Sequence, residues 1–229
     1  MSIFRSLLRV LYPIACPGCG EMLLTNEVDL CVQCQMSLPL THFSNTPFNL
    51  TEQRITGRFP YASATSYMYY QGCTISRPIV HAIKYHDNIR LARTLGRRMG
   101  LDLIQSGRFD DVELIIPIPL HPRKQRQRDY NQSEELCRGI SEITHLPVIT
   151  NNLYRNRYTN TQTHLSANER FINMQEVFSI RHPKQLHNRH ILIVDDVITT
   201  GATIEAACKP LLTIPGITIS IATLAIASK

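Results

Sequence analysis

One segment near the carboxyl end of the chain constrains the fold more than any other. Residues 191–194 are four consecutive aliphatic residues, a pattern typical of a strand that is buried on both faces of a parallel sheet. Two adjacent carboxylates, Asp195 and Asp196, follow directly, and the next residues lead into a predicted helix at 202–212. A buried strand, a polar turn and a helix in this order are the repeating unit of α/β proteins, so the segment predicts that class.

The rest of the chain after residue 60 continues the alternation of strands and helices. The predicted strands cover residues 62–70, 112–118, 147–149, 191–194 and 217–226. The predicted helices cover residues 78–85, 89–104, 131–143 and 202–212, the last with an unexplained Pro210 inside it. We therefore expect a parallel sheet with helices on both faces over 61–229, preceded by a linker at 41–60 and a small module at 1–40.

The turn after Asp196 has the composition of a phosphate-binding site. It reads Thr199-Thr200-Gly201-Ala202-Thr203 and combines three hydroxyls, a glycine for close approach and the free N–H groups at the start of a helix. Paired carboxylates would repel a simple phosphate, but they can accept hydrogen bonds from the hydroxyls of a sugar. The alternative is a solvent-exposed Asp-Asp turn before an ordinary helix. The complete strand, acid, turn and helix arrangement favours a sugar phosphate at the carboxyl edge of the sheet.

Four cysteines predict a metal site in the first module. They are spaced as two Cys-x-x-Cys pairs eleven residues apart: Cys16, Cys19, Cys31 and Cys34. Such a spacing suits tetrahedral Zn²⁺ bound by thiolates, whereas disulfides or a redox pair, the alternatives, do not require two matched pairs. Because cysteine would fill all four positions, we expect the zinc to be structural.

Charge and hydropathy exclude several classes of protein. No apolar run is long enough to span a membrane, and 43% hydrophobic residues exclude global disorder. Residues 1–13 resemble a targeting signal only weakly, since Arg9 and Pro13 interrupt the apolar run, and they are expected to form a short lead-in helix. With its thiol-rich module, the chain is expected in the cytoplasm. All of the net charge of +6 falls after residue 60, which indicates anionic ligands.

Several motifs together resemble one known family. Residues 191–203 resemble the phosphoribosyl pyrophosphate (PRPP) signature of type I phosphoribosyltransferases. The cysteine pairs, Ile83-Lys84-Tyr85, the segment 117–132 and the segment that begins with Arg155 and Arg157 narrow the resemblance to the ComF family, also called GntX. Nearly the whole chain from Cys16 onward is covered. One departure is Asp129, which stands where the family usually has glycine and adds a carboxylate near the expected pyrophosphate site.

The resemblance implies a type I phosphoribosyltransferase-like fold and a role for each motif. The 5′-phosphate of PRPP would bind at 199–203, with Asp195 and Asp196 at the ribose, and Mg²⁺ would accompany the pyrophosphate. The pyrophosphate loop would supply Arg123, Lys124, Arg126 and Arg128. Arg155 and Arg157 are the candidate catalytic residues, in a stretch that could close as a lid; the alternative is that both are ordinary surface arginines.

Two functions remain open at this stage. The family's association with natural competence indicates a PRPP-binding protein that acts in DNA uptake or the use of external DNA, with other DNA-uptake proteins as partners. The alternative is an active transferase that moves phosphoribosyl onto a nucleobase or related acceptor, although little chain follows Thr203 to build a base pocket. Single-stranded DNA is a further candidate ligand, and the cations expected to contact it are Arg90, Arg93, Arg97 and Arg98.

Overall fold

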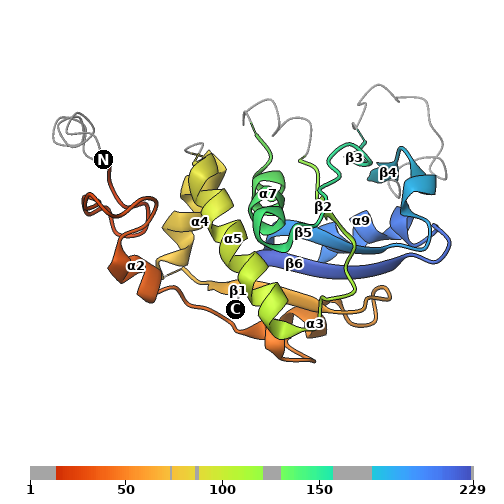
Figure 1. Ribbon diagram of the computed structural model, residues 1–229. Helices are drawn as coiled ribbons and strands as arrows, with labels where there is room; N and C mark the ends of the chain where they lie inside the picture. The colour runs from red at the N-terminus through yellow and green to blue at the C-terminus, as the bar shows by residue number, and fades with distance from the viewer. Residues whose placement is uncertain (1–13, 73, 86–87, 121–129, 157–176, 228–229) are drawn as a thin grey trace, which may run out of the picture.

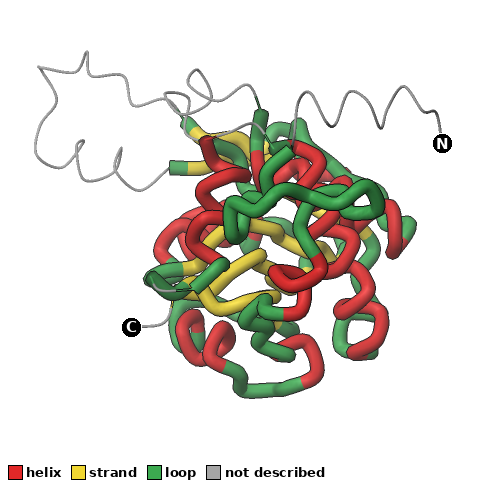
Figure 2. Tube along the Cα trace, turned by 90° about the vertical axis from the view of Figure 1, so that its left-hand side faces the viewer, coloured by secondary structure: helices red, strands yellow, loops and turns green. Residues whose placement is uncertain are grey.

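The computed structural model describes residues 14–72, 74–85, 88–120, 130–156 and 177–227. Its centre is a sheet of four parallel strands in the order β1-β6-β5-β2. Their bounds are Ala64–Tyr70 for β1, Thr218–Ala227 for β6, His190–Ile198 for β5 and Leu114–Pro117 for β2. A parallel bridge from Ile115 to Val148 adds the predicted strand at 147–149 beside β2. The sheet confirms the predicted fold class, and the sheet lies in the middle of the molecule with helices around it (Figure 2).

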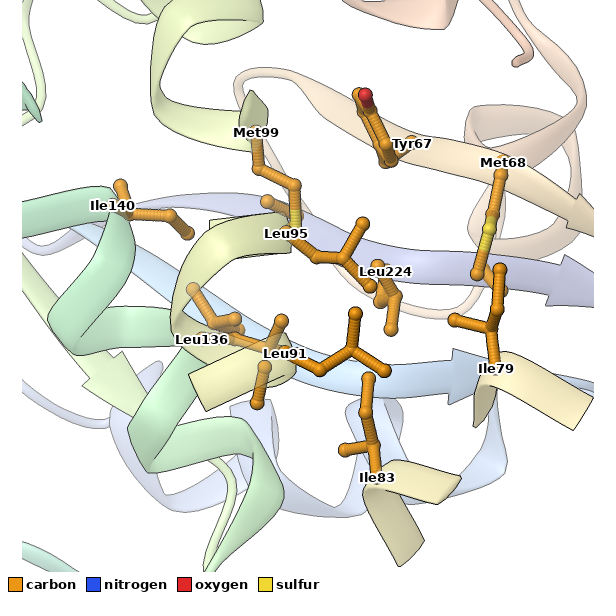
Figure 3. Close-up of a cluster of buried hydrophobic side chains, with 14 of the residues drawn as sticks. Tyr67, Met68, Ile79, Ile83, Leu91, Leu95, Met99, Leu136, Ile140 and Leu224 are labelled. Carbon is orange, nitrogen blue, oxygen red and sulfur yellow. The ribbon is translucent and has the colours of Figure 1, made fainter. Parts of the chain in front are cut away.

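Helices cover both faces of this sheet. On one face lie α4 (Ser76–Tyr85), α5 (Ile89–Ser106) and α7 (Gln132–Thr144), visible in front of the strands in Figure 1. The apolar side chains of these helices meet Leu192 and Val194 of β5 in one core cluster, part of which is drawn in Figure 3. On the other face α9 (Ala202–Leu211) packs against Ile191 and Ile193 in a second cluster. Successive residues of β5 thus enter opposite cores, which is why residues 191–194 are all apolar.

Helices α5 and α7 cross at unusually close range. A Cβ atom added to Gly139 would lie 2.2 Å from the carbonyl oxygen of Arg93, and one added to Gly96 would lie 2.3 Å from that of Leu136. Both contacts are with backbone, so only glycine fits at either position. The crossing holds α7 over β2 and β5, where its first turn reaches the carboxyl edge of the sheet.

Residues 41–60, predicted to be a linker, hold short helices that belong to the packed body. They include η1 (Phe43–Asn45) and α3 (Leu50–Ile55). Asn49 caps α3 by accepting hydrogen bonds from the backbone N–H groups of Thr51 and Glu52, and its side-chain amide donates to the carbonyl of Ala64 on β1 at 2.8 Å. Ile55 is fully buried. Long-range packing, which local sequence pattern does not reveal, orders this segment. The unit boundaries at residues 40 and 60 stay a prediction.

The remaining elements are short. They are α2 (Val32–Met36), β3 (Leu153–Arg155), β4 (Phe178–Ile180) and η2 (Pro183–Leu186), of which β3 and β4 form a separate antiparallel pair. Pro210 lies in the last turn of α9, where it interrupts few further helical hydrogen bonds. Among the described residues, no helix has the length and apolar character needed to cross a membrane.

Candidate functional site

The two predicted carboxylates lie on the part of β5 that extends beyond the end of β2. Pairing of β2 with β5 stops at Pro117 and Val194, whereas pairing of β6 with β5 continues to Ile198. Asp195 is therefore the first residue of β5 without a β2 partner. The predicted strand ended at Val194 because the acids are polar, but hydrogen bonds to β6 carry the strand four residues further.

Asp195 is enclosed by the first turn of α7. The hydroxyl of Ser133 donates to Asp195 Oδ1 at 3.1 Å, and the backbone N–H of Asp196 donates to the same oxygen at 2.8 Å. Burial, and then the charge of Asp196, raise the pKa of Asp195 to about 7, against these two hydrogen bonds and the charge of Lys84. Near neutral pH, Asp195 is therefore poised between its acid and carboxylate forms.

Asp196 has a cationic partner that the sequence analysis did not place in the site. Lys84 Nζ, at the end of α4, lies 3.1 Å from Asp196 Oδ2, and both side chains are less than one quarter exposed. The phenol of Tyr130 donates to the carbonyl of Ile83 and so ties the end of α4 to the chain that enters α7. The only sequence signal for Lys84 was its place in the Ile83-Lys84-Tyr85 motif.

The predicted phosphate-binding turn directly follows β5. Thr199, Thr200, Ala202 and Thr203 are exposed, and Ala202 and Thr203 form the start of α9. Gly201 is the N-cap of α9 and has a φ of 82°, in the left-handed region. Because glycine has no side chain, no side-chain hydrogen bond caps the helix. The start of α9 and the three exposed threonine side chains thus follow the carboxylate pair directly along the chain.

Glycine at position 201 has a second cause. A Cβ atom there would lie 3.3 Å from Ile55 Cγ2 and 3.6 Å from the carbonyl oxygen of Arg54. The structure thus shows a close approach of the Gly201 backbone to α3, and the approach to a ligand that the sequence predicts stays a prediction.

The other predicted site residues are only partly described. Arg155 lies on β3, with its guanidinium carbon 5.3 Å from the centre of the Phe178 ring on β4. The other residues of the predicted site lie outside the described part of the chain. They are Arg123, Lys124, Arg126 and Arg128 of the pyrophosphate loop, together with Asp129 and Arg157.

The four arginines of α5 that we expected to contact DNA are engaged within the protein. Arg93 pairs with Glu135 at 2.5 Å and Arg97 with Glu142 at 2.8 Å, both on α7. The other two bind the cysteine module: Arg90 pairs with Asp29 at 3.0 Å, and Arg98 donates to the side-chain amide of Gln35 at 2.5 Å. The sequence shows these arginines as cations available to a ligand, whereas in the structure acidic and amide groups from distant segments pair with them.

The four predicted metal-ligand cysteines converge. The sulfur atoms of Cys16, Cys19, Cys31 and Cys34 all lie within 4.8 Å of one another, and none of these cysteines forms a disulfide. The sulfur atoms of Cys19 and Cys31 are 3.7 Å apart, which matches the edge of a tetrahedron with ~2.3 Å metal–sulfur bonds. A Cβ atom on Gly18 would lie 2.8 Å from the sulfur of Cys34, so glycine at this position lets the first cysteine pair approach the second. The cluster can hold a metal ion.

Comparisons with known proteins identify a matching domain and relatives of this chain. The model of the phosphoribosyl transferase domain matches residues 135–229. The DNA utilization protein YhgH of Shigella flexneri is 32% identical over 206 residues, which are 86% of this chain and 83% of that protein. Competence protein F of Haemophilus influenzae is 33% identical over 135 residues, 57% of this chain and 59% of that protein. A solved hypoxanthine phosphoribosyl transferase of Trypanosoma cruzi aligns with a TM-score of 0.36 and 16% identity, over 62% of this chain and 75% of that one.

The parallel sheet and the matched domain define a type I phosphoribosyltransferase-like protein with a four-cysteine cluster near its N-terminus. Within that class the chain belongs to the ComF family, together with the YhgH and competence F proteins.

Proposed function

We propose that this protein binds PRPP at the carboxyl edge of β5 and acts in the use of external DNA. The observation that carries the binding proposal is the position of Asp195 and Asp196, beyond the end of β2 and beside the Thr199–Thr203 turn. Threonine hydroxyls and helix N–H groups suit the 5′-phosphate, and carboxylates suit the ribose hydroxyls.

The remaining roles follow from the charge of PRPP. Arg123, Lys124, Arg126 and Arg128 are proposed to bind the pyrophosphate, since they follow β2 in the sequence and β2 ends at the same edge of the sheet. Mg²⁺, when bound with PRPP, would neutralise charge on the leaving pyrophosphate. Arg155 and Arg157 stay candidate catalytic residues.

Binding can be tested by calorimetry with PRPP and Mg²⁺. The double variant Asp196→Asn/Thr200→Val is expected to abolish binding while the melting temperature stays close to that of the wild type. Asp111→Asn/Thr213→Val is a matched control, because both residues are exposed and lie at the opposite edge of the sheet. Wild-type affinity in the Asp196 double variant would refute the proposal.

Zinc is proposed as the structural metal of the cysteine cluster. Four thiolates within 4.8 Å of one another suit Zn²⁺ and leave no position open for a catalytic water. Free thiols and PRPP are both compatible with the cytoplasm, which we propose as the location of the protein. Elemental analysis of protein purified without chelator should find one zinc per chain.

The biological role rests on the relatives, whose names refer to DNA utilization and competence. A strain that lacks this gene should take up or use external DNA poorly, and the Asp196→Asn/Thr200→Val variant should not restore that use. Full restoration by this variant would separate the DNA-related role from PRPP binding. A pyrophosphate-release assay with PRPP and a panel of bases and nucleic acids distinguishes a transferase from a PRPP-binding protein.

A further inference from the structure

The segment of chain that packs under the phosphate-binding turn comes from α3, some 145 residues earlier. Arg54 of α3 forms a hydrogen bond to the turn: its Nη1 donates to the carbonyl of Thr199 at 2.6 Å. The same Nη1 donates to the carbonyl of Ala227, at the end of β6, at 2.7 Å. One guanidinium therefore joins the turn to the end of the neighbouring strand.

The bond to Thr199 has a directional consequence. All described peptide bonds are trans, and in a trans peptide the carbonyl and the following N–H point in opposite directions. Because the carbonyl of Thr199 points to Arg54 on α3, the N–H of Thr200 points away from α3. The donor of this peptide is thus held on the side away from α3, and Thr200 and Thr203 of the same turn are exposed.

Helix α3 is itself held firmly enough to orient the turn. Glu52 is buried, forms an ion pair with Arg108 at 2.5 Å and accepts a hydrogen bond from the backbone N–H of Ala64 on β1 at 3.1 Å. Ile55 packs against the position of Gly201. The guanidinium of Arg54 therefore projects from a fixed helix, and little entropy is lost when it orders the turn.

A second arginine of the same segment compensates a charge that would oppose phosphate. Glu205 lies in the first turn of α9, where a carboxylate competes with an anionic ligand for the positive end of the helix. Arg58 Nη1 lies 3.0 Å from Glu205 Oε2 and lowers the pKa of Glu205, and Arg58 Nε donates to the carbonyl of Arg54. Arg58 thus offsets the charge of Glu205 and links it to the Arg54 contact.

We propose that Arg54 is a positioning residue for the 5′-phosphate, which it serves by orienting the Thr199–Thr200 peptide. This inference rests on the proposed PRPP site and adds to it a part of the chain outside the matched phosphoribosyl transferase domain. The ligand class is a sugar 5-phosphate, since the contact acts on the turn and not on the pyrophosphate loop.

Two ligands separate this role from a general effect on the fold. Ribose 5-phosphate carries only the 5′-phosphate group, and pyrophosphate carries only the leaving group. By calorimetry, Arg54→Met is expected to weaken ribose 5-phosphate binding by about tenfold or more, the equivalent of one hydrogen bond to a charged group, and to leave pyrophosphate affinity within about twofold. Arg54→Lys keeps the charge and one donor, so its affinity for ribose 5-phosphate should lie between those of the wild type and Arg54→Met.

The control is Arg189→Met, which removes an exposed arginine that pairs with Glu113 at the opposite edge of the sheet. It should bind both ligands like the wild type. Equal ribose 5-phosphate affinity in Arg54→Met and the wild type would overturn the inference. So would variants, Arg54→Met and Arg54→Lys, that each lose as much affinity for pyrophosphate as for ribose 5-phosphate. A wild-type protein that binds neither ligand would instead refute the proposed function, and the inference with it.

Discussion

Replacement of Asp195 by asparagine should make the protein more stable at neutral pH. Asp195 Oδ1 accepts hydrogen bonds from Ser133 and from the N–H of Asp196, and the amide oxygen of asparagine can accept both. The variant therefore removes a poorly solvated charge beside Asp196 without removing the hydrogen bonds that surround it. A binding site that keeps such a charge lowers the stability of the folded protein in exchange for a group that contacts the ligand.

The magnitude follows from the pKa of Asp195. Its pKa is raised from 3.8 to about 7 on folding, by burial first and then by Asp196, which corresponds to as much as about 4 kcal/mol. Below about pH 4 the residue is protonated in both the folded and the unfolded chain and costs nothing. As the pH rises to about 7, the unfolded chain loses the proton first, so the folded state is progressively destabilised, and above about pH 7 the full cost is present.

Denaturant unfolding across this pH range, without PRPP or Mg²⁺, measures the difference. The free energy of unfolding of Asp195→Asn should match that of the wild type near pH 4 and exceed it by about 1–4 kcal/mol at pH 8. Asp111→Asn, at an exposed position, should show no such divergence. A gap that does not change with pH, or an Asp195→Asn protein less stable than the wild type at pH 8, would refute this account. Carbon-13 NMR titration of the Asp195 carboxyl should give a midpoint near 7.

The other predictions concern the cysteine cluster and the helix crossing. Cys31→Ser should release zinc and unfold the first module while ribose 5-phosphate still binds, and elemental analysis that finds no metal in the wild type would contradict the zinc site. Gly139→Ala should lower the free energy of unfolding by about 2 kcal/mol, because its Cβ would lie 2.2 Å from the backbone of α5. Gly72→Ala, which has open space around it, should leave the free energy of unfolding unchanged. Equal melting temperatures for Gly139→Ala and the wild type would contradict the close crossing of the two helices. Arg93→Gln should lower the melting temperature without changing the salt dependence of any DNA binding, since Arg93 already pairs with Glu135; a flatter salt dependence with unchanged stability would show that it contacts phosphate.

The sequence by itself determined the elements whose signals are local. Aliphatic residues at 191–194, the acid pair and the threonine-rich turn predict a strand, its end and a helix start, because each depends on neighbours within a few positions. The cysteine spacing predicts a metal cluster for the same reason, and the sulfur atoms do converge. The fold class and the outline of the candidate site could therefore be read from the residues.

Only the tertiary structure decided what surrounds those elements. Residues 41–60 carry no periodic pattern, yet Arg54 contacts Ala227, 173 positions away, and its helix packs against the turn that we propose binds phosphate. Strand β5 continues past its acids because β6 offers hydrogen bonds, and Lys84 reaches Asp196 because α4 ends at the same edge of the sheet. The arginines of α5 look free in the sequence and are paired in the fold. Each of these outcomes depends on the free energy of contacts between distant segments, which the chain acquires only when the sheet and its covering helices pack together.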